Sequence, residues 1–260
     1  MSEYETLSVE QAGPIVTVVL DRPDAANGMN DAMTRELAAV AQQCTAPEVK
    51  AVVLTGAGRF FCAGGDLKAM AASPLGPGRF VKGIADDLHR AIATFARMDA
   101  VLISAVNGAA AGAGFSIAVA ADLVLAADTA SFTMAYTRAG LSPDGSASYY
   151  LPRLVGVRRA AELMLTNRTL SASDALQWGL VNEVVPAAGL AARADELSAQ
   201  IASAAKGSSG SVKKLLLASF GSTIEDQMEL EAELIGACAD SPDGHEGIDA
   251  FLNKRAPNFS

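Results

Sequence analysis

The amino-acid sequence predicts an α/β fold, and three observations support this. Runs of β-branched and other apolar residues typical of strands occupy positions 15–20, 49–55, 101–106 and 123–126. Segments with the apolar spacing of a helix lie between these runs, and such alternation is typical of α/β domains. From about residue 187 the strand pattern disappears and only helical patterns remain. We therefore expect an α/β part followed by a helical part.

The helical segments are defined by their apolar spacing. Residues 31–44 place apolar side chains such as Leu37 and Val40 on one side, and residues 79–98 repeat the pattern. Residues 73–78 (SPLGPG) are rich in Pro and Gly and predict a loop. The C-terminal helices are expected at residues 188–205, 211–220, 224–239 and 244–252.

The change of pattern along the chain bears on domain organisation. A length of 260 residues, half of them hydrophobic, suits one large domain or a domain with an appendage. We expect residues 1–190 to form the core and residues 191–260 to form a helical appendage. Composition alone leaves a single mixed domain open.

Composition excludes several classes of function. A net charge of −9 without a basic stripe argues against nucleic-acid binding. Three scattered cysteines and two histidines indicate neither a disulfide framework nor a metal site. The N-terminal segment is acidic and lacks the apolar stretch of a signal peptide, so we expect a cytoplasmic protein with reduced thiols. Residues 101–121 carry no charge, but Asn107 and the glycines among them predict strand, turn and helix rather than a membrane span.

Two stretches carry the strongest functional signal. Residues 53–70 (VLTGAGRFFCAGGDLKAM) and 105–122 (AVNGAAAGAGFSIAVAAD) each begin as an apolar strand, break into a Gly/Ala turn and enter a helix. Small residues let another molecule approach the backbone, and N–H groups at a helix start carry partial positive charge. Two such turns could aim two N–H donors at one carbonyl oxygen, as in an oxyanion hole. The alternative is a pair of ordinary strand-to-helix turns.

Five segments, in order along the chain, resemble the enoyl-CoA hydratase/isomerase (crotonase) superfamily. They are residues 22–30 (RPDAANGMN), 63–67 (AGGDL), 107–114 (NGAAAGAG), 140–156 (GLSPDGSASYYLPRLVG) and 251–259 (FLNKRAPNF). The resemblance implies a crotonase-like spiral of ββα units that binds and transforms an acyl-CoA thioester, followed by a helical trimerisation region. It further implies a homotrimer or homohexamer and no cofactor, since CoA is part of the substrate.

The resemblance also assigns site residues. The two oxyanion N–H donors of the family fall on Gly65 and Ala113; relatives often have Gly at the second position, and the donor survives if φ of Ala113 is negative. The segments that contact CoA in the family contribute Arg22, Asp24, Ala26, Gly28, Ala63, Gly65, Asp66, Leu67, Lys68, Ala113, Tyr136, Phe251 and Lys254. The last two would come from a neighbouring subunit. The alternatives are an acid at a helix start for Asp66 and a charged, frayed end for the tail.

The acid and base groups distinguish the possible reactions. The positions of the two glutamates that activate water in classical hydratases hold Ser116 and Tyr136 here, and neither suits base catalysis at neutral pH. Asp144, in the segment LSPDG, matches the position where several enoyl-CoA isomerases place a single proton-transferring acid. The alternative is a helix N-cap, because Pro-Asp-Gly before a helix is a common capping arrangement.

His89 adds a further possibility. Its spacing from Asn107 resembles that in 4-chlorobenzoyl-CoA dehalogenase, which pairs a histidine with an aspartate at the Asp144 position. A surface or pocket-wall histidine is the favoured interpretation, and a base is the alternative. The predicted function is an enoyl-CoA isomerase in which Asp144 moves a proton. The alternatives are an enoyl-CoA hydratase, a dehalogenase-like hydrolase in which Asp144 attacks an aryl carbon, and a CoA-binding protein without turnover.

Overall fold

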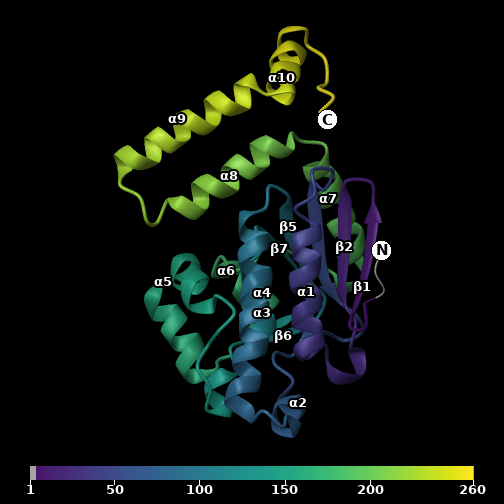
Figure 1. The fold of residues 1–260 in the computed structure, drawn as a ribbon, viewed down its shortest axis with the longest axis vertical. Coiled ribbons are helices and arrows are strands. Elements are labelled where there is room, and N and C mark those ends of the chain that lie inside the picture. Colours follow the sequence, from purple (N-terminus) through teal and green to yellow (C-terminus); the bar gives the residue numbers. More distant parts are fainter. Residues whose placement is uncertain (1–3, 260) are drawn as a thin grey trace.

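The structure, a computed structural model, describes residues 4–259, and its strands form two sheets (Figure 1). The larger sheet contains, in spatial order, β1 (Leu7–Ala12), β2 (Ile15–Leu20), β3 (Ala51–Gly56), β5 (Val101–Val106), β7 (Leu123–Ala127) and β10 (Glu183–Val185). The smaller sheet contains β4 (Phe60–Cys62), β6 (Ala109–Ala111), β8 (Ser131–Thr133) and β9 (Leu170–Ser171). Only the pairs β1–β2 and β8–β9 are antiparallel among the described strands.

A strand–strand–helix unit repeats along the core. The first strand of each unit (β3, β5 or β7) joins the larger sheet, the second (β4, β6 or β8) joins the smaller sheet, and helices follow. Because every unit feeds both sheets, successive units advance side by side like the turns of a spiral. The predicted α/β fold with ββα units is confirmed. The helices are α1 (Asp31–Gln43), α2 (Leu67–Ala72), α3 (Pro77–Arg97), α4 (Ala113–Val119), α5 (Ala147–Thr166), α6 (Ala172–Gln177), α7 (Leu190–Ala202), α8 (Lys206–Ala218), α9 (Ile224–Asp240) and α10 (Pro242–Leu252).

Most elements follow the sequence patterns closely. The strands predicted at 15–20 and 101–106 coincide with β2 and β5. The predicted loop 73–78 is shorter, because α3 begins at Pro77, and proline suits a first helical turn whose N–H groups are unpaired anyway. Residues 101–121 form β5, β6 and α4 with their connections, as expected. Within residues 4–259, no helix is both long and apolar enough to cross a membrane.

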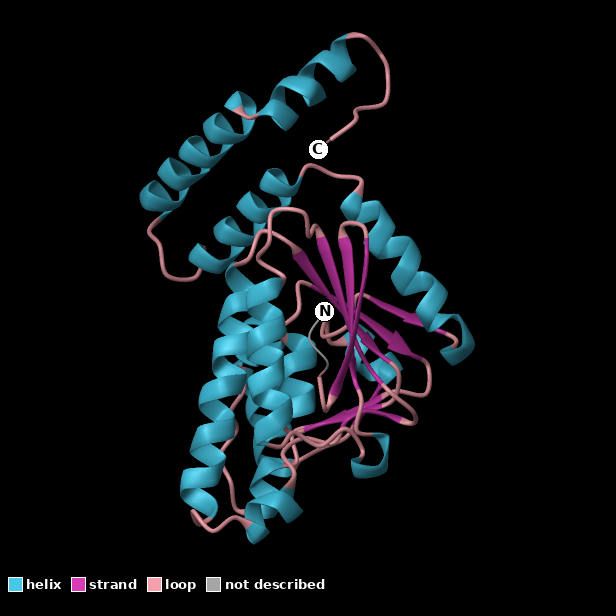
Figure 2. Cartoon of the chain, turned by 45° about the vertical axis from the view of Figure 1, so that its right-hand side comes forward, coloured by secondary structure: helices cyan, strands magenta, loops and turns pink. Residues whose placement is uncertain are grey.

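Helices cover both faces of the larger sheet (Figure 2). α7 packs across β3, β5 and β7 on one face, and α1 and α3, which pack against each other, lie on the other. The apolar sides predicted for these two helices face inward, since Leu37, Leu88 and Phe95 are almost completely buried. This packing holds α3 in place, and α3 forms part of the site described below.

The three last helices, α8, α9 and α10, extend beyond the sheets (Figure 1). Two lysines join α8 to the core: Lys206 donates to the backbone oxygens of Ala46 and Pro47, and Lys213 reaches the core next to Asp122. Six large apolar side chains on or beside α8 and α9 remain more than half exposed: Val212, Leu216, Phe220, Ile224, Met228 and Ile235. These six apolar side chains therefore lie on the surface of the single chain.

Lys213 forms a buried polar anchor. Its Nζ lies 2.8 Å from Asp122 Oδ2, 2.8 Å from the oxygen of Phe95 and 2.6 Å from that of Ala100, and the residue is 7% exposed. Burial raises the pKa of Asp122 although Lys213 and the Leu102 N–H act in the opposite direction. The removal of Lys213 would leave the partly exposed Asp122 carboxylate without its cation and the two backbone oxygens without their donor.

We therefore expect Lys213→Met to lower the free energy of unfolding by about 1–3 kcal/mol, the usual cost of leaving buried hydrogen-bond acceptors without a donor; Asp122 itself stays partly solvated. The neighbouring Lys214 pairs with Asp99 on the surface, so Lys214→Met should cost less than about 1 kcal/mol. Urea denaturation of the two variants measures the difference. Equal effects of the two substitutions would contradict an anchoring role for Lys213.

Candidate active site

The two Gly/Ala turns meet backbone to backbone. Gly64, after β4, has φ +97°, and Gly112, before α4, has φ +51°, a region that favours glycine. A Cβ atom on Gly64 would stand 2.9 Å from the oxygen of Ala111, and one on Gly114 would overlap the Cys62 backbone. Only residues without side chains allow β4 and α4 to approach this closely.

This approach brings the two predicted oxyanion donors to one cavity. Gly65 and Ala113 both line it, and Ala113 is the first residue of α4, outside the left-handed region, as its expected donor role requires. Neither N–H donates a hydrogen bond to any part of the chain that the structure describes. Two backbone donors are thus available to a ligand oxygen.

The cavity has a volume of about 320 Å³ and mostly apolar walls. Of the described residues that line it, Asp144 alone carries a carboxylate. The apolar wall comes from α2, α3, the residue Met29 before α1 and the segment before Asp144: Met29, Leu67, Met70, Val81, Ile84, Leu88 and Leu141. Among residues 4–259, no three His, Cys, Asp or Glu side chains gather closely enough to hold a metal ion.

Asp144 belongs to a short chain of hydroxyl groups. The Tyr136 hydroxyl donates to Asp144 Oδ1 at 2.5 Å, and Ser116 Oγ lies 3.1 Å from the same hydroxyl. The phenolic proton is used toward Asp144, so only the Ser116 hydroxyl can donate in the second contact, and its single proton is shared between Tyr136 and the Gly112 oxygen, 3.2 Å away. Burial, followed by the charge of Asp144, raises the pKa of Tyr136 well above its ordinary value, so the phenol stays protonated.

The helix-cap alternative for Asp144 is wrong. The N-cap residue of α5 is Ser146, and no side chain caps that helix end. The Asp144 carboxylate instead accepts the Tyr136 hydrogen bond at the cavity wall. Ser116 and Tyr136, the residues at the two hydratase positions, are therefore both linked to Asp144, one directly and one through its neighbour.

His89 lies on α3, exposed, beside the turn that carries Asp144. Its Nε2 accepts a hydrogen bond of 3.1 Å from the backbone N–H of Gly145. His89 and Asp144 also line a second, more open cavity of about 660 Å³. The histidine thus contacts the backbone next to the carboxylate.

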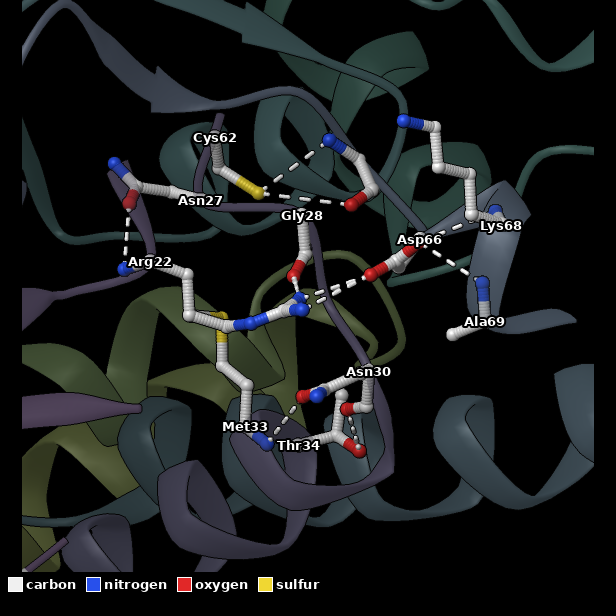
Figure 3. Close-up of polar contacts among 11 residues, drawn as sticks. Arg22, Asn27, Gly28, Asn30, Met33, Thr34, Cys62, Asp66, Lys68 and Ala69 are labelled. Carbon is white, nitrogen blue, oxygen red and sulfur yellow. Dashed lines mark hydrogen bonds and ion pairs between the residues drawn. The ribbon is translucent and has the colours of Figure 1, made fainter. Parts of the chain in front are cut away.

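The first family-like segment is tied to the oxyanion turn by polar contacts (Figure 3). Arg22 donates to the oxygen of Gly28 and pairs with Asp66 Oδ2 at 3.1 Å. Buried Asn27 accepts from the Arg22 N–H and donates to backbone oxygens around β4. Asp66 also caps α2 by accepting from the N–H groups of Lys68 and Ala69. Although burial opposes the charge, these hydrogen bonds lower the pKa of Asp66.

The residues predicted to contact CoA fall into three groups. Ala63, Gly65, Leu67, Ala113 and Tyr136 line the first cavity. Arg22, Asp24, Ala26 and Gly28 lie in the segment before α1, and Asp66 and Lys68 lie at the start of α2. Phe251 and Lys254 are exposed on α10 and the tail, at the opposite end of the molecule from α2 (Figure 1). The roles of all these residues toward CoA stay predictions.

Several residues of the site are absent from the sequence-based assignment. Thr34 and Val81 line the cavity although no motif marks them, and Met29 and Met70 line it although the motif segments that contain them gave them no role. Ile84 and Leu88 belong to the apolar side of the helix that the sequence predicts over residues 79–98. That side faces both the core and the cavity, and helical spacing by itself does not separate the two.

Comparisons with known proteins agree with this architecture. The enoyl-CoA hydratase/isomerase family profile matches residues 10–260. The chain is 38% identical to a probable enoyl-CoA hydratase of Rhodobacter capsulatus over 99% of this chain and 98% of that one. It is 36% identical to a 1,2-epoxyphenylacetyl-CoA isomerase of Escherichia coli over 100% and 99%. The crystal structure of an enoyl-CoA hydratase from Polaromonas superposes with a TM-score of 0.93 at 32% identity, covering 98% of this chain and 99% of that one. The chain therefore belongs to the enoyl-CoA hydratase/isomerase (crotonase) family.

Proposed function

We propose that this family member is an enoyl-CoA isomerase, which shifts a double bond within an acyl-CoA thioester. The observation that carries the proposal is the arrangement of one carboxylate, Asp144, in a cavity with two unpaired backbone donors, Gly65 and Ala113. A double-bond shift needs one group that removes a proton and returns it to another carbon. It does not need a second carboxylate to activate water.

The proposed reaction proceeds through an enolate. The thioester oxygen accepts hydrogen bonds from the N–H groups of Gly65 and Ala113, which stabilise the negative charge that develops on it. Asp144 takes a proton from the carbon α or γ to the carbonyl, and the C–H electron pair moves into the enolate. The protonated Asp144 then returns the proton to the other carbon, and the double bond moves by one position. Substrate and product have the same atoms and oxidation level.

The surroundings of Asp144 support this role. Tyr136 holds Oδ1, so the carboxylate has a defined orientation and Oδ2 is left for the substrate proton. The apolar wall suits an acyl group without charge near the reacting carbons. CoA is part of the substrate in this proposal. Its phosphates would contact cations such as Lys254 of a neighbouring subunit.

An enoyl-CoA hydratase is the second candidate. It is favoured by the name of the Rhodobacter capsulatus relative, a probable enoyl-CoA hydratase. In this chain Asp144 would have to activate the water without a second carboxylate. Ser116 and Tyr136 carry hydroxyl groups at the positions where the resemblance implies glutamates. Incubation with 2-enoyl-, 3-enoyl- and aryl-CoA esters separates the candidates. Isomerisation keeps the mass of the ester, hydration adds one water, and hydrolytic dehalogenation exchanges halide for hydroxyl.

Asp144→Asn keeps the shape of the side chain and removes its basicity. We expect turnover of a 3-enoyl-CoA ester to fall by about 10²–10⁴-fold, the usual contribution of a general base. Binding of the ester and the melting temperature should stay near those of the parent protein. The matched control is Asp86→Asn, an exposed carboxylate on α3 that pairs with Lys82 and should leave turnover unchanged. Parent-like turnover by Asp144→Asn would exclude the mechanism.

Tyr136 should remain a neutral phenol well into the alkaline range. Burial and the negative charge of Asp144 both favour the protonated form, so the pKa moves upward. We therefore expect the ultraviolet difference between the parent protein and Tyr136→Phe to show no tyrosinate between about pH 9 and 11, where an ordinary tyrosine with a pKa of about 10 titrates. Circular dichroism at each pH verifies that both proteins stay folded. A difference signal centred near pH 10 would contradict the proposed hydrogen bond.

The exposed apolar side chains of α8 and α9 lead us to propose a homotrimer or homohexamer, as family resemblance implies. Six large apolar side chains, more than half exposed, form a surface that monomeric proteins rarely carry. Multi-angle light scattering at micromolar concentration should give three or six times the mass of one chain. A monomeric mass would refute this assembly and, with it, the CoA contact from a neighbouring subunit.

A further inference from the structure

The turn that carries Asp144 has an uncommon backbone. Gly145 and Ser146 are both left-handed, with φ of +59° and +68°. Left-handed backbone in a residue other than glycine costs of order 1–3 kcal/mol and persists only where its surroundings hold it. Gly145 is buried, and a Cβ atom on it would stand 2.9 Å from Ser116 Cβ and 3.4 Å from Leu88 Cδ2. The turn is therefore pressed against α3 and α4.

Two contacts hold this turn from different elements. Tyr136 holds the carboxylate of Asp144 at 2.5 Å, and His89 on α3 accepts from the N–H of Gly145 at 3.1 Å. That N–H belongs to the peptide group that follows the Cα atom of Asp144. A fixed orientation of this peptide restricts the direction in which the Asp144 side chain leaves the backbone.

The same contact determines what His89 can do chemically. A neutral imidazole has one nitrogen that donates and one that accepts. Because Nε2 accepts from Gly145, the proton resides on Nδ1, and no lone pair is left to take a proton from substrate or water. We infer that His89 is a positioning residue that anchors the turn of Asp144 through the Gly145 N–H, and that it is not a base. This inference rests on the proposed isomerase function, in which Asp144 is the only base.

Substitutions at position 89 separate the two roles. Glutamine can place its amide oxygen near the Nε2 position and accept from Gly145, but it is not a base. We expect His89→Gln to keep kcat within about 3-fold of the parent, because the hydrogen bond is preserved. His89→Leu should lower kcat by about 10-fold or more with KM within about 3-fold, since a displaced carboxylate impairs catalysis more than binding. The control, His245→Leu on α10, should leave both constants unchanged.

The outcomes are distinct. Losses of about 10²–10⁴-fold in both His89→Gln and His89→Leu would identify His89 as a base and overturn the inference. Parent-like kcat in His89→Leu would overturn it as well, because no anchoring would then be needed.

A spectroscopic measurement tests the anchor without turnover. The chain has only two histidines, so imidazole ¹⁵N resonances can be assigned by comparison with His245→Gln. We expect the proton of the neutral imidazole of His89 to reside on Nδ1, and a proton on Nε2 would overturn the inference. If the Nδ1–H form is found but the parent protein isomerises no ester, the proposed function fails while the anchor to Gly145 stands.

Discussion

The site depends on one steric constraint, the backbone-to-backbone approach of the two Gly/Ala turns. Gly64 and Gly114 lie where a side chain would collide with the opposite segment, so β4 and α4 can meet only without one. As a result, Gly65 and Ala113 line a common cavity although 48 positions separate them. The Arg22–Asp66 ion pair and buried Asn27 then tie the preceding loop to the same turn (Figure 3).

The polar groups around Asp144 come from three different elements. Ser116 belongs to α4, Tyr136 begins a short 3₁₀-helix that spans Tyr136–Ala139, and His89 belongs to α3. Each contributes through a hydrogen bond rather than a charge: two hydroxyl groups in series reach the carboxylate, and an imidazole reaches the next peptide. Among the described residues that line this mostly apolar cavity, Asp144 alone carries a carboxylate, and its orientation is restricted from several sides. Such pre-organisation lowers the reorganisation needed when charge develops on a substrate.

The helical C-terminal part shows a different balance of forces. Lys206 and Lys213 join α8 to the core. Their ammonium groups donate hydrogen bonds to backbone oxygens, and that of Lys213 also pairs with Asp122. Large apolar side chains on or beside α8 and α9 remain exposed, and two of them, Leu216 and Phe220, line an open cavity between α8 and α5. The lysine contacts fix the position of α8 on the core. The exposed apolar side chains would supply the driving force for association with another chain.

The sequence by itself determined the elements whose patterns are long enough to read. β2, β5 and the helices of the C-terminal part follow apolar periodicity. The Gly/Ala composition of the two turns led to the prediction of an oxyanion hole, which stays a prediction. β4, β6 and β8 have three residues each, too few for a period, so the repeated ββα unit is visible only in the sheets. Only the tertiary structure decided that Asp144 faces a cavity instead of capping α5. Its partner Tyr136 and the pairing of His89 with Gly145 depend on distances between elements, and the second pair is 56 positions apart. A local sequence pattern records what a residue can donate or accept; which group it meets is determined by packing of the whole chain.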